Sequence, residues 1–113
     1  NFHGTSTVVN DRVETLAVKN VFNSLAARIP VSSTKSMVGH PQGASGGLGV
    51  TVSLLSLKNS FLTPTINQEN PDPECDLDYI SNEGREKKLD IAISNCISFG
   101  SKNSALVLGK FSG

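Results

Sequence analysis

The chain contains two histidines, His3 and His40, and each lies in a loop rich in Gly, Ser and Thr. His3 is part of NFHGTST, and His40 ends SSTKSMVGH. Imidazole changes charge near neutral pH, so it suits proton transfer and hydrogen-bond donation to an oxyanion. Because loops on a rigid scaffold often carry catalytic residues, the pair predicts an active site assembled from two loops. The alternative is that each histidine only caps or lines a turn.

Lys35 lies five residues before His40, among four hydroxyl residues. A single lysine is usually a solvated charge. Beside an imidazole in a buried loop, however, its positive charge would keep that imidazole neutral, because adjacent cations repel. A neutral imidazole can donate a hydrogen bond to a developing oxyanion. Lys35 is therefore a third candidate for the site.

Other kinds of site have weaker support in the sequence. His3, His40, Cys75 and Cys96 are possible zinc ligands, but they lack the close paired spacings of zinc sites, so we expect no metal. The glycine-rich run at 43–49 matches neither dinucleotide-binding nor P-loop patterns. Its small residues instead predict a helix start that packs closely against neighbouring backbone.

The composition is that of one small domain without a strong charge. Ten basic and ten acidic side chains among 113 residues give zero net charge, which does not favour nucleic acid or an anionic membrane as a partner. No membrane span is visible, and two cysteines are too few for a disulfide framework. We therefore expect a cytoplasmic protein, or one of a mitochondrial or plastid matrix. The chain opens directly on a motif without an initiator Met, which we interpret as a piece of something longer.

Helical spacing of apolar residues predicts a helix over 11–25 whose apolar side is buried and whose other side, with Arg12, Lys19 and Asn20, faces solvent. Asn10 or Asp11 would cap it, and Glu14 would complete an approximate capping box. A second helix over 48–57 is apolar on every side, so it must be buried on every side. A chain of this length can hardly supply two covering layers. The second helix therefore predicts that partner material is missing.

The rest of the chain predicts a connection and a hairpin. Prolines punctuate residues 61–88, which are typical of an ordered surface connection, with a brief extended piece near 77–80. Alternating apolar residues predict strands over 89–94 and 104–109, which could form a wide hairpin.

Several runs of the sequence resemble one family. NFHGTSTVVNDRVETLAVKNVF resembles the first histidine motif of β-ketoacyl-acyl-carrier-protein synthases, usually N-A-H-G-T-S-T followed by an Asp and a helix. SSTKSMVGHPQGASGG resembles their second motif, S-S-T-K-S-x-x-G-H-x-x-G-A-A-G. The run from PTINQ to AISN and the closing FGSKNSALVL are similar to the C-terminal end of the type II, elongating form. The resemblance covers essentially all 113 residues in order.

The resemblance implies an α/β chain, the C-terminal half of a thiolase-like fold with α-β-α-β-α layers. Residues 1–113 would form one half-domain, and the nucleophilic cysteine would belong to an N-terminal half absent from this chain. It further implies a condensing enzyme of fatty-acid or polyketide synthesis, which joins an acyl thioester to malonyl-acyl carrier protein by decarboxylative Claisen condensation. No cofactor is implied, because phosphopantetheine on the carrier protein holds the substrates. The implied partners are that carrier protein, the N-terminal half and a second copy in a homodimer.

Motif matching assigns roles to individual residues. His3 and His40 would donate hydrogen bonds to the enolate oxygen, so their side chains should converge on a shared point. Lys35 would orient and tune His40. Two threonines, Thr5 and Thr7, match hydroxyls that contact the pantetheine arm, and Phe99 matches an aromatic gate beside the nucleophile.

The sequence also departs from the family pattern. Phe2 replaces the usual Ala, Val8 stands where Pro is common, and residues 41–42 replace a pair that is often aliphatic. Gly49 stands where elongating members usually have Glu, and 96–103 reads CISFGSKN in place of S-F-G-F-G-G-T-N. These departures leave three alternatives: a chain-length partner subunit, a decarboxylase-only relative, or an interaction module without chemistry. Phe99 lies in FGSKN, a loop between two predicted strands in which Gly100 supplies a hinge, and this place predicts that Phe99, and not Cys96, borders the acyl pocket.

Overall fold

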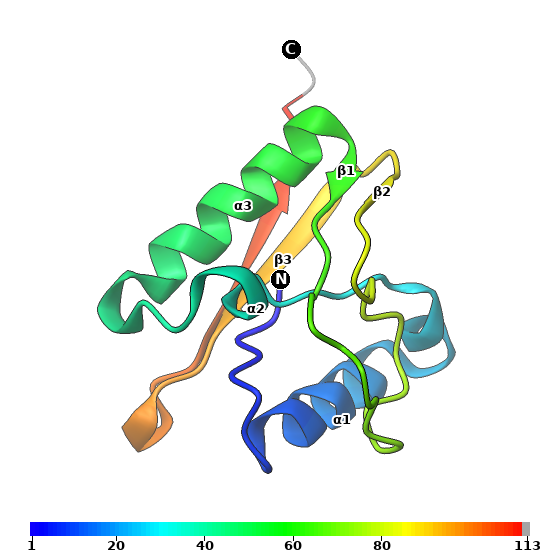
Figure 1. Cartoon of the computed structure of the whole chain (residues 1–113). Helices are drawn as coiled ribbons and strands as arrows, with labels where there is room; N and C mark the ends of the chain where they lie inside the picture. Colours follow the sequence, from blue (N-terminus) through cyan, green and yellow to red (C-terminus); the bar gives the residue numbers. More distant parts are fainter. Residues whose placement is uncertain (112–113) are drawn as a thin grey trace.

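The computed structural model describes residues 1–111; Ser112 and Gly113, the last residues of the expected half-domain, lie outside the described residues. The elements follow one another along the chain as Figure 1 shows. They are α1 (Asn10–Phe22), the 3-10 helix η1 (Asn23–Arg28), α2 (Lys35–Val38), η2 (Gln42–Ala44), α3 (Ser45–Asn59), β1 (Phe61–Leu62), β2 (Arg85–Glu86), β3 (Ile91–Cys96), η3 (Phe99–Ser101) and β4 (Ser104–Gly109).

The two long strands form the hairpin that the alternating sequence predicts. β3 and β4 are antiparallel, in a register that runs from Ile91 opposite Gly109 to Cys96 opposite Ser104. β4 has the predicted bounds, whereas β3 begins two residues later than the predicted strand, at Ile91. The turn between the strands contains η3, in which Gly100 adopts φ 76°, a value that favours glycine. The hairpin is therefore confirmed.

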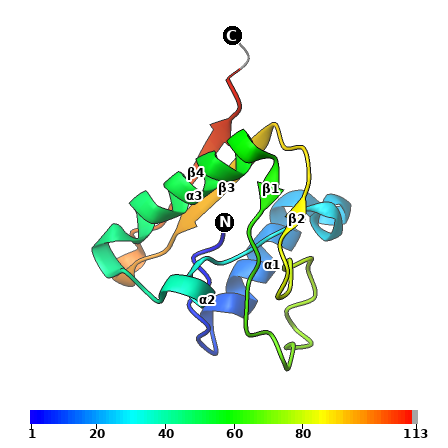
Figure 2. The same cartoon turned by 45° about the horizontal axis from the view of Figure 1, so that its top comes forward.

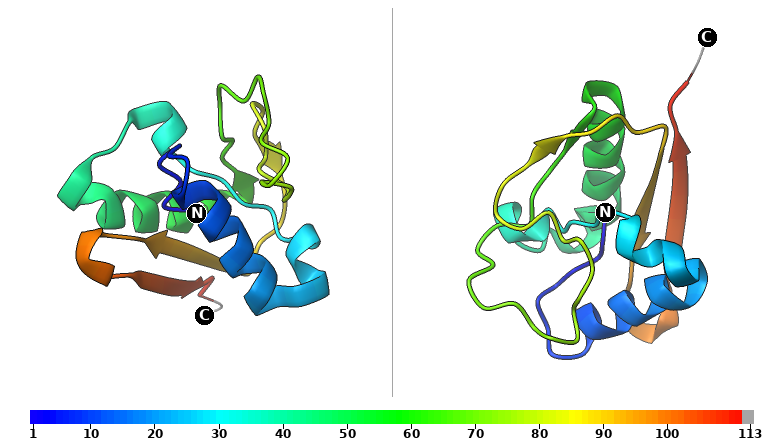
Figure 3. Two further views of the ribbon diagram at one scale, coloured as in Figure 1. Left: turned by 90° about the horizontal axis from the view of Figure 1, so that it is seen from below. Right: turned by 90° about the vertical axis from the view of Figure 1, so that its right-hand side faces the viewer.

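α3 runs along the hairpin, as Figure 3 shows from two directions. Its buried residues, Ser45, Gly49, Ser53 and Leu57, recur every fourth position and form a single stripe. A stripe of mostly small side chains lets a helix approach a neighbouring sheet closely. The prediction of an apolar helix here is confirmed. Cover on every side is not present within the described residues, because Leu54 and Leu55 are about half exposed.

α1 differs from the prediction in its ends and in its covered face. It begins at Asn10 without a side-chain cap and gives way to η1 after Phe22, so the predicted helix is confirmed over most of 11–25, whereas the predicted cap and the end at 25 are wrong. Its buried residues are Glu14 and Thr15, whereas apolar residues such as Leu16 are more than half exposed.

The connection at 61–88 lies along the polar side of α1. Arg12 pairs with Asp72 at 2.9 Å and with Glu74, and Lys19 pairs with Asp76. These ion pairs hold the connection against the polar side of α1. These pairs do not cover the apolar side of α1.

The connection is ordered and extended, as predicted, and it adds a second small sheet. β1 pairs with β2 in antiparallel fashion, and single parallel bridges join Pro30 to Asp78 and Thr65 to Ser81. Figure 2 shows this connection folded beside α1 and the segment that follows it. Val31 and the first three residues of the second histidine motif, 32–34, are buried.

An apolar cavity of about 580 Å³ separates α1 from α3 and β3. Its walls include Val18, Val21, Val52, Ile91 and Ile93.

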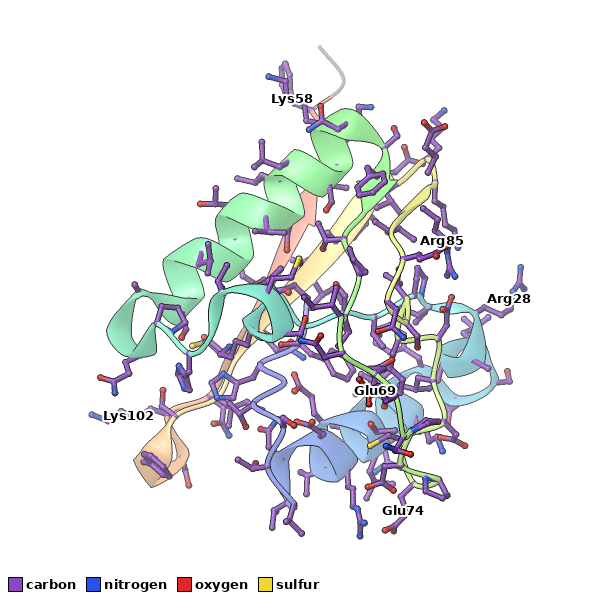
Figure 4. All side chains as sticks on the ribbon, in the orientation of Figure 1. Arg28, Lys58, Glu69, Glu74, Arg85 and Lys102 are labelled. Carbon is purple, nitrogen blue, oxygen red and sulfur yellow. The ribbon has the colours of Figure 1, made fainter. Side chains whose placement is uncertain are left out.

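Within residues 1–111, no helix combines the length and the apolar character needed to cross a membrane. The charged side chains labelled in Figure 4 include Arg28, Lys58 and Lys102, which project from different edges of the molecule.

Candidate active site

The two histidines lie side by side although 37 positions separate them in sequence. Their ring centroids are 5.4 Å apart, and the planes meet at 84° in an edge-to-face arrangement. His3 is buried, with 7% of its surface exposed, whereas His40 lies at the exposed side of the pair. The predicted convergence of the two imidazoles is confirmed. Donation by both to one oxygen stays a prediction.

A buried carboxylate holds the loop that carries His3. The backbone N–H groups of His3 and Gly4 donate to the two oxygens of Glu14 at 2.9 and 3.0 Å. The side-chain amides of Asn10 and Asn95 donate to the same carboxylate at 3.3 and 3.0 Å. Glu14 is only 2% exposed. Four donors around one buried carboxylate make a rigid support, because hydrogen bonds to charged acceptors are stronger than neutral ones.

The sequence prediction missed this role of Glu14. The capping-box interpretation directs a glutamate at this position to the start of its own helix. In the structure the carboxylate reaches past the start of α1 to His3 and Gly4. The available signal was an acidic residue in the second turn of a helix that directly follows a histidine loop.

Gly4 adopts a conformation that no other residue would take easily. Its φ is +41°, and a Cβ built there would lie 2.4 Å from Ser33 Cβ. The Ser33 hydroxyl in turn donates to the Gly4 carbonyl at 2.8 Å. The two motifs therefore touch through this glycine, which fixes the spacing between the two histidine loops.

The loop that carries His40 is held mainly by its own residues. The backbone N–H of Gln42 donates to His40 Nδ1 at 3.0 Å, and Ser45 Oγ lies 3.1 Å from the same nitrogen. A nitrogen that accepts an N–H bond must carry a lone pair and no proton. In the neutral ring the proton is then on Nε2, which leaves Nε2–H as a hydrogen-bond donor.

The electrostatic surroundings keep His3 neutral. Burial, followed by the positive charge of Lys35, lowers the pKa of His3 below its usual 6.5, while Glu14 acts in the opposite direction. Burial likewise lowers the pKa of Lys35, opposed by Cys96 and Glu14. Lys35 begins α2 and is half-buried. The structure thus assigns an effect of Lys35 to His3, which the sequence prediction did not include; its predicted role toward His40 stays a prediction.

The predicted substrate contacts lie at the margin of the pair. The hydroxyls of Thr5 and Thr7 are 3.2 Å apart, and Thr7 also accepts the N–H of Asn10 at 3.3 Å. Phe99, at the tip of the hairpin, is fully exposed. Neither histidine lines the 580 Å³ apolar cavity. The described residues bring the histidines together and leave Phe99 outside that cluster.

Gly49, which departs from the family pattern, lies where two other side chains approach the helix. A Cβ at this position would be 2.7 Å from Asn1 Nδ2 and 2.7 Å from Ser94 Oγ. A longer side chain would therefore require both neighbours to move. Among the described residues, no three side chains of His, Cys, Asp or Glu gather as a metal site.

These features define what the site can do chemically. It offers one buried neutral imidazole, a second imidazole with a defined donor nitrogen, and an ammonium group nearby. Such donors can stabilise negative charge that develops on an oxygen between them. Within the described residues Cys96 is half-buried and Cys75 lies in the connection, and neither takes part in this hydrogen-bond network.

Comparisons with known proteins agree with this geometry. The family model described as β-ketoacyl synthase, C-terminal domain, matches residues 1–69. The 3-oxoacyl-[acyl-carrier-protein] synthase 2 of Coxiella burnetii is 48% identical over 110 residues, covering 97% of this chain and 27% of the relative. The synthase of the same name from Staphylococcus aureus is 50% identical over 111 residues, covering 98% and 27%. The chain therefore spans about a quarter of the length of these relatives.

Solved structures show the same arrangement. The ketosynthase of a complex described as a type II PKS acyl-carrier protein with its ketosynthase bound to the hexaketide matches with a TM-score of 0.96 and 36% identity, over 98% of this chain and 27% of that one. The ishigamide ketosynthase/chain length factor matches with a TM-score of 0.94 and 35% identity, over 99% and 27%. The fold is thus the C-terminal part of a thiolase-like ketosynthase fold. With both histidine motifs inside the matched residues, the chain belongs to the β-ketoacyl synthase C-terminal domain family.

Proposed function

We propose that this chain supplies the two histidines of a condensing enzyme that joins an acyl thioester to malonyl-acyl carrier protein. The observation that carries the proposal is the edge-to-face pair of His3 and His40 at 5.4 Å, with the donor nitrogen of His40 defined by Gln42. The names of the relatives, 3-oxoacyl-[acyl-carrier-protein] synthase 2, support the same reaction class.

The histidines act in the decarboxylation step. The bond between the malonyl α-carbon and its carboxylate breaks, and its electron pair moves toward the thioester carbonyl, so that CO₂ leaves and an enolate forms. His40 donates its Nε2–H to the enolate oxygen, and His3 donates to the same oxygen. Neutral donors suit this task because they stabilise the new oxyanion more than the starting carboxylate. Lys35 favours the neutral form of His3.

Condensation needs a residue that this chain does not hold in its site. The enolate carbon attacks the carbonyl of an acyl group held as a thioester on a cysteine, and the thiolate leaves. We assign that cysteine to the remainder of the intact protein, because the chain spans 27% of its relatives. The uncovered apolar residues of α1 and α3 support a large contact with that remainder.

The edge of β3 that faces away from β4 supports the same contact. The N-terminal amine of Asn1 donates to the Ile93 carbonyl at 2.6 Å, and the Asn95 N–H donates to the Asn1 carbonyl at 2.9 Å. This is the bonding pattern of a parallel pair. A further strand that continues this pairing toward Ile91 would border the 580 Å³ cavity.

The carrier protein and a second copy of the enzyme are the proposed partners. One similar structure is a ketosynthase in complex with its acyl-carrier protein, which supports the first. The phosphopantetheine arm of the carrier would pass Thr5 and Thr7, and Phe99 would border the acyl pocket once the remainder of the protein surrounds it.

Gly49 favours a second candidate, a relative that decarboxylates without elongating. Gly49 stands where elongating members usually have Glu, and Asn1 and Ser94 occupy the space that a side chain would need. The two functions share the histidine pair and differ in acyl transfer. Elongation of an acyl thioester, measured beside CO₂ release, separates them.

The test is CO₂ release from malonyl-acyl carrier protein by the intact protein. His3→Ala and His40→Ala should each slow release by roughly 10²–10³-fold, the loss typical of one oxyanion donor. Asn20→Ala, on the exposed side of α1, serves as the control and should leave the rate unchanged. If neither histidine variant slows release, the proposed roles are wrong and only the fold assignment stands.

A further inference from the structure

The first residue of α3 points its side chain back toward His40. Ser45 Oγ lies 3.1 Å from His40 Nδ1, and Ser45 is buried, with 8% of its surface exposed. The short helix η2 (Gln42–Ala44) turns the chain so that the two residues meet. The second histidine motif that this chain resembles reads G-A-A-G where this chain has GASG, so the hydroxyl is a feature of this sequence.

The direction of the bond follows from the second contact of the ring. The Gln42 N–H already points at Nδ1 from 3.0 Å, so Nδ1 presents its lone pair. A proton on Nδ1 would face that N–H group, and two hydrogens would compete for the same space. The Ser45 hydroxyl is therefore the donor, and Nδ1 accepts from both groups.

The two donors hold the ring by different means. Gln42 begins the exposed three-residue helix η2 and adopts a positive φ of 46°, a conformation that is uncommon for residues other than glycine. Ser45 belongs to a helix of 15 residues that packs along β3. We propose that Ser45 is a positioning residue, which ties His40 to α3 and keeps its proton on Nε2. This inference rests on the proposed function of His40 as an oxyanion donor.

A positioning role has a kinetic signature. Ser45 bonds to the nitrogen of His40 opposite the one that would touch the enolate oxygen, so its loss should weaken transition-state stabilisation and leave malonyl-carrier binding unchanged. Loss of one hydrogen bond of ordinary net strength should lower kcat by about three- to ten-fold and leave KM nearly unchanged.

The experiment compares Ser45→Ala with Ser45→Thr and Ser53→Ala in the intact protein. Ser45→Thr retains the hydroxyl and should restore kcat. Ser53→Ala is the matched control, because Ser53 is equally buried in the same helix and donates to the Gly49 carbonyl at 2.8 Å, away from His40. Ser45→Cys, which keeps the size of the side chain but has a weaker donor, replaces Ser45→Ala if that variant fails to fold.

Two readouts are required, CO₂ release from malonyl-acyl carrier protein and the tautomer of His40 from ¹⁵N NMR of labelled histidine, assigned with His40→Ala. We expect the neutral ring of the unsubstituted protein to carry its proton on Nε2. In Ser45→Ala only the exposed N–H of Gln42 still bonds to Nδ1, and we expect that single bond to give way in part, so that a mixture of tautomers appears. An unchanged tautomer in Ser45→Ala would overturn the proposal, as would a loss of kcat equal to that of Ser53→Ala. If His40→Ala leaves CO₂ release unchanged, the proposed function fails, whereas the NMR result still decides the positioning role.

Discussion

The two histidine loops are held in different ways. Contacts from other elements hold the His3 loop: Glu14 from α1 and Ser33 from the second motif bond to it directly, and Asn95 from β3 bonds to Glu14. Neighbours within five residues, Gln42 and Ser45, bond to the His40 ring. His3 is buried, and His40 lies at the surface of the described chain. One loop therefore depends on the assembled fold, and the other is nearly complete in its own sequence.

The largest expected effect comes from removing the Glu14 carboxylate, which supports the His3 loop and not the His40 loop. Glu14→Gln replaces one accepting oxygen by an NH₂ group that faces donors, so buried N–H groups lose their partner. We expect the free energy of unfolding of the intact protein to fall by about 3 kcal/mol, because each buried unsatisfied donor costs about 1–3 kcal/mol. Chemical denaturation measures it. Glu69→Gln, on an exposed side chain, is the control; equal stability of the two variants would contradict the role of Glu14.

A glycine in each loop gives a matched pair. Gly4→Ala forces a Cβ to within 2.4 Å of Ser33 at a φ of +41°, whereas a Cβ at Gly43 meets nothing within 4 Å. We expect Gly4→Ala to destabilise the intact protein by about 2 kcal/mol. Gly43→Ala should change stability by less than about 1 kcal/mol. Thermal denaturation compares the two, and equal effects would show that the His3 loop adapts more readily than its contacts indicate.

The pKa of His3 tests the charge beside the pair. Lys35→Met removes a positive charge, so the pKa of His3 should rise toward 6.5, while Lys35→Arg should keep it low. Because the pKa of His3 is lower in the folded protein, the unfolded chain binds more protons than the folded protein below about pH 6.5. The stability that the neutral His3 contributes is therefore complete above that pH, and it is lost as pH decreases through the folded pKa. Lys35→Met should reduce this loss of stability at low pH, because it brings the folded pKa of His3 closer to the unfolded one. NMR titration of His3 measures the shift; an unchanged pKa in Lys35→Met would leave burial and His40 as the causes of the lowering.

The smallest expected effect concerns the His40 loop. Gln42→Gly relieves a positive φ of 46° and retains the backbone N–H that binds His40. We expect a gain in stability of up to about 1 kcal/mol, with no loss of CO₂ release. Gln42→Ala, which keeps the unfavourable φ, should not show the gain. A large loss of activity in Gln42→Gly would mean that the glutamine side chain, and not its backbone, supports the site.

The contrast between the loops also explains which predictions from sequence succeeded. The convergence of His3 and His40, the family and the β3–β4 hairpin follow from motifs and alternation that lie within short stretches of chain. The covered face of α1 did not follow. Its apolar residues were expected to be the buried side, but Glu14 and Thr15 are buried instead, Glu14 against the His3 loop and Thr15 against Tyr79 of the connection.

The sequence by itself determined the reacting groups and the apolar helix at 48–57, because local spacing sets local conformation. The turn that brings Gln42 and Ser45 to His40 is local as well, but the sequence analysis did not predict it. Only the tertiary structure decided that Glu14 supports His3, that Lys35 acts on His3, and that Gly49 lies against Asn1 and Ser94. These contacts join residues 11 to 48 positions apart. Which residues meet depends on how the helices and strands pack together, and a pattern of neighbouring residues does not determine that packing.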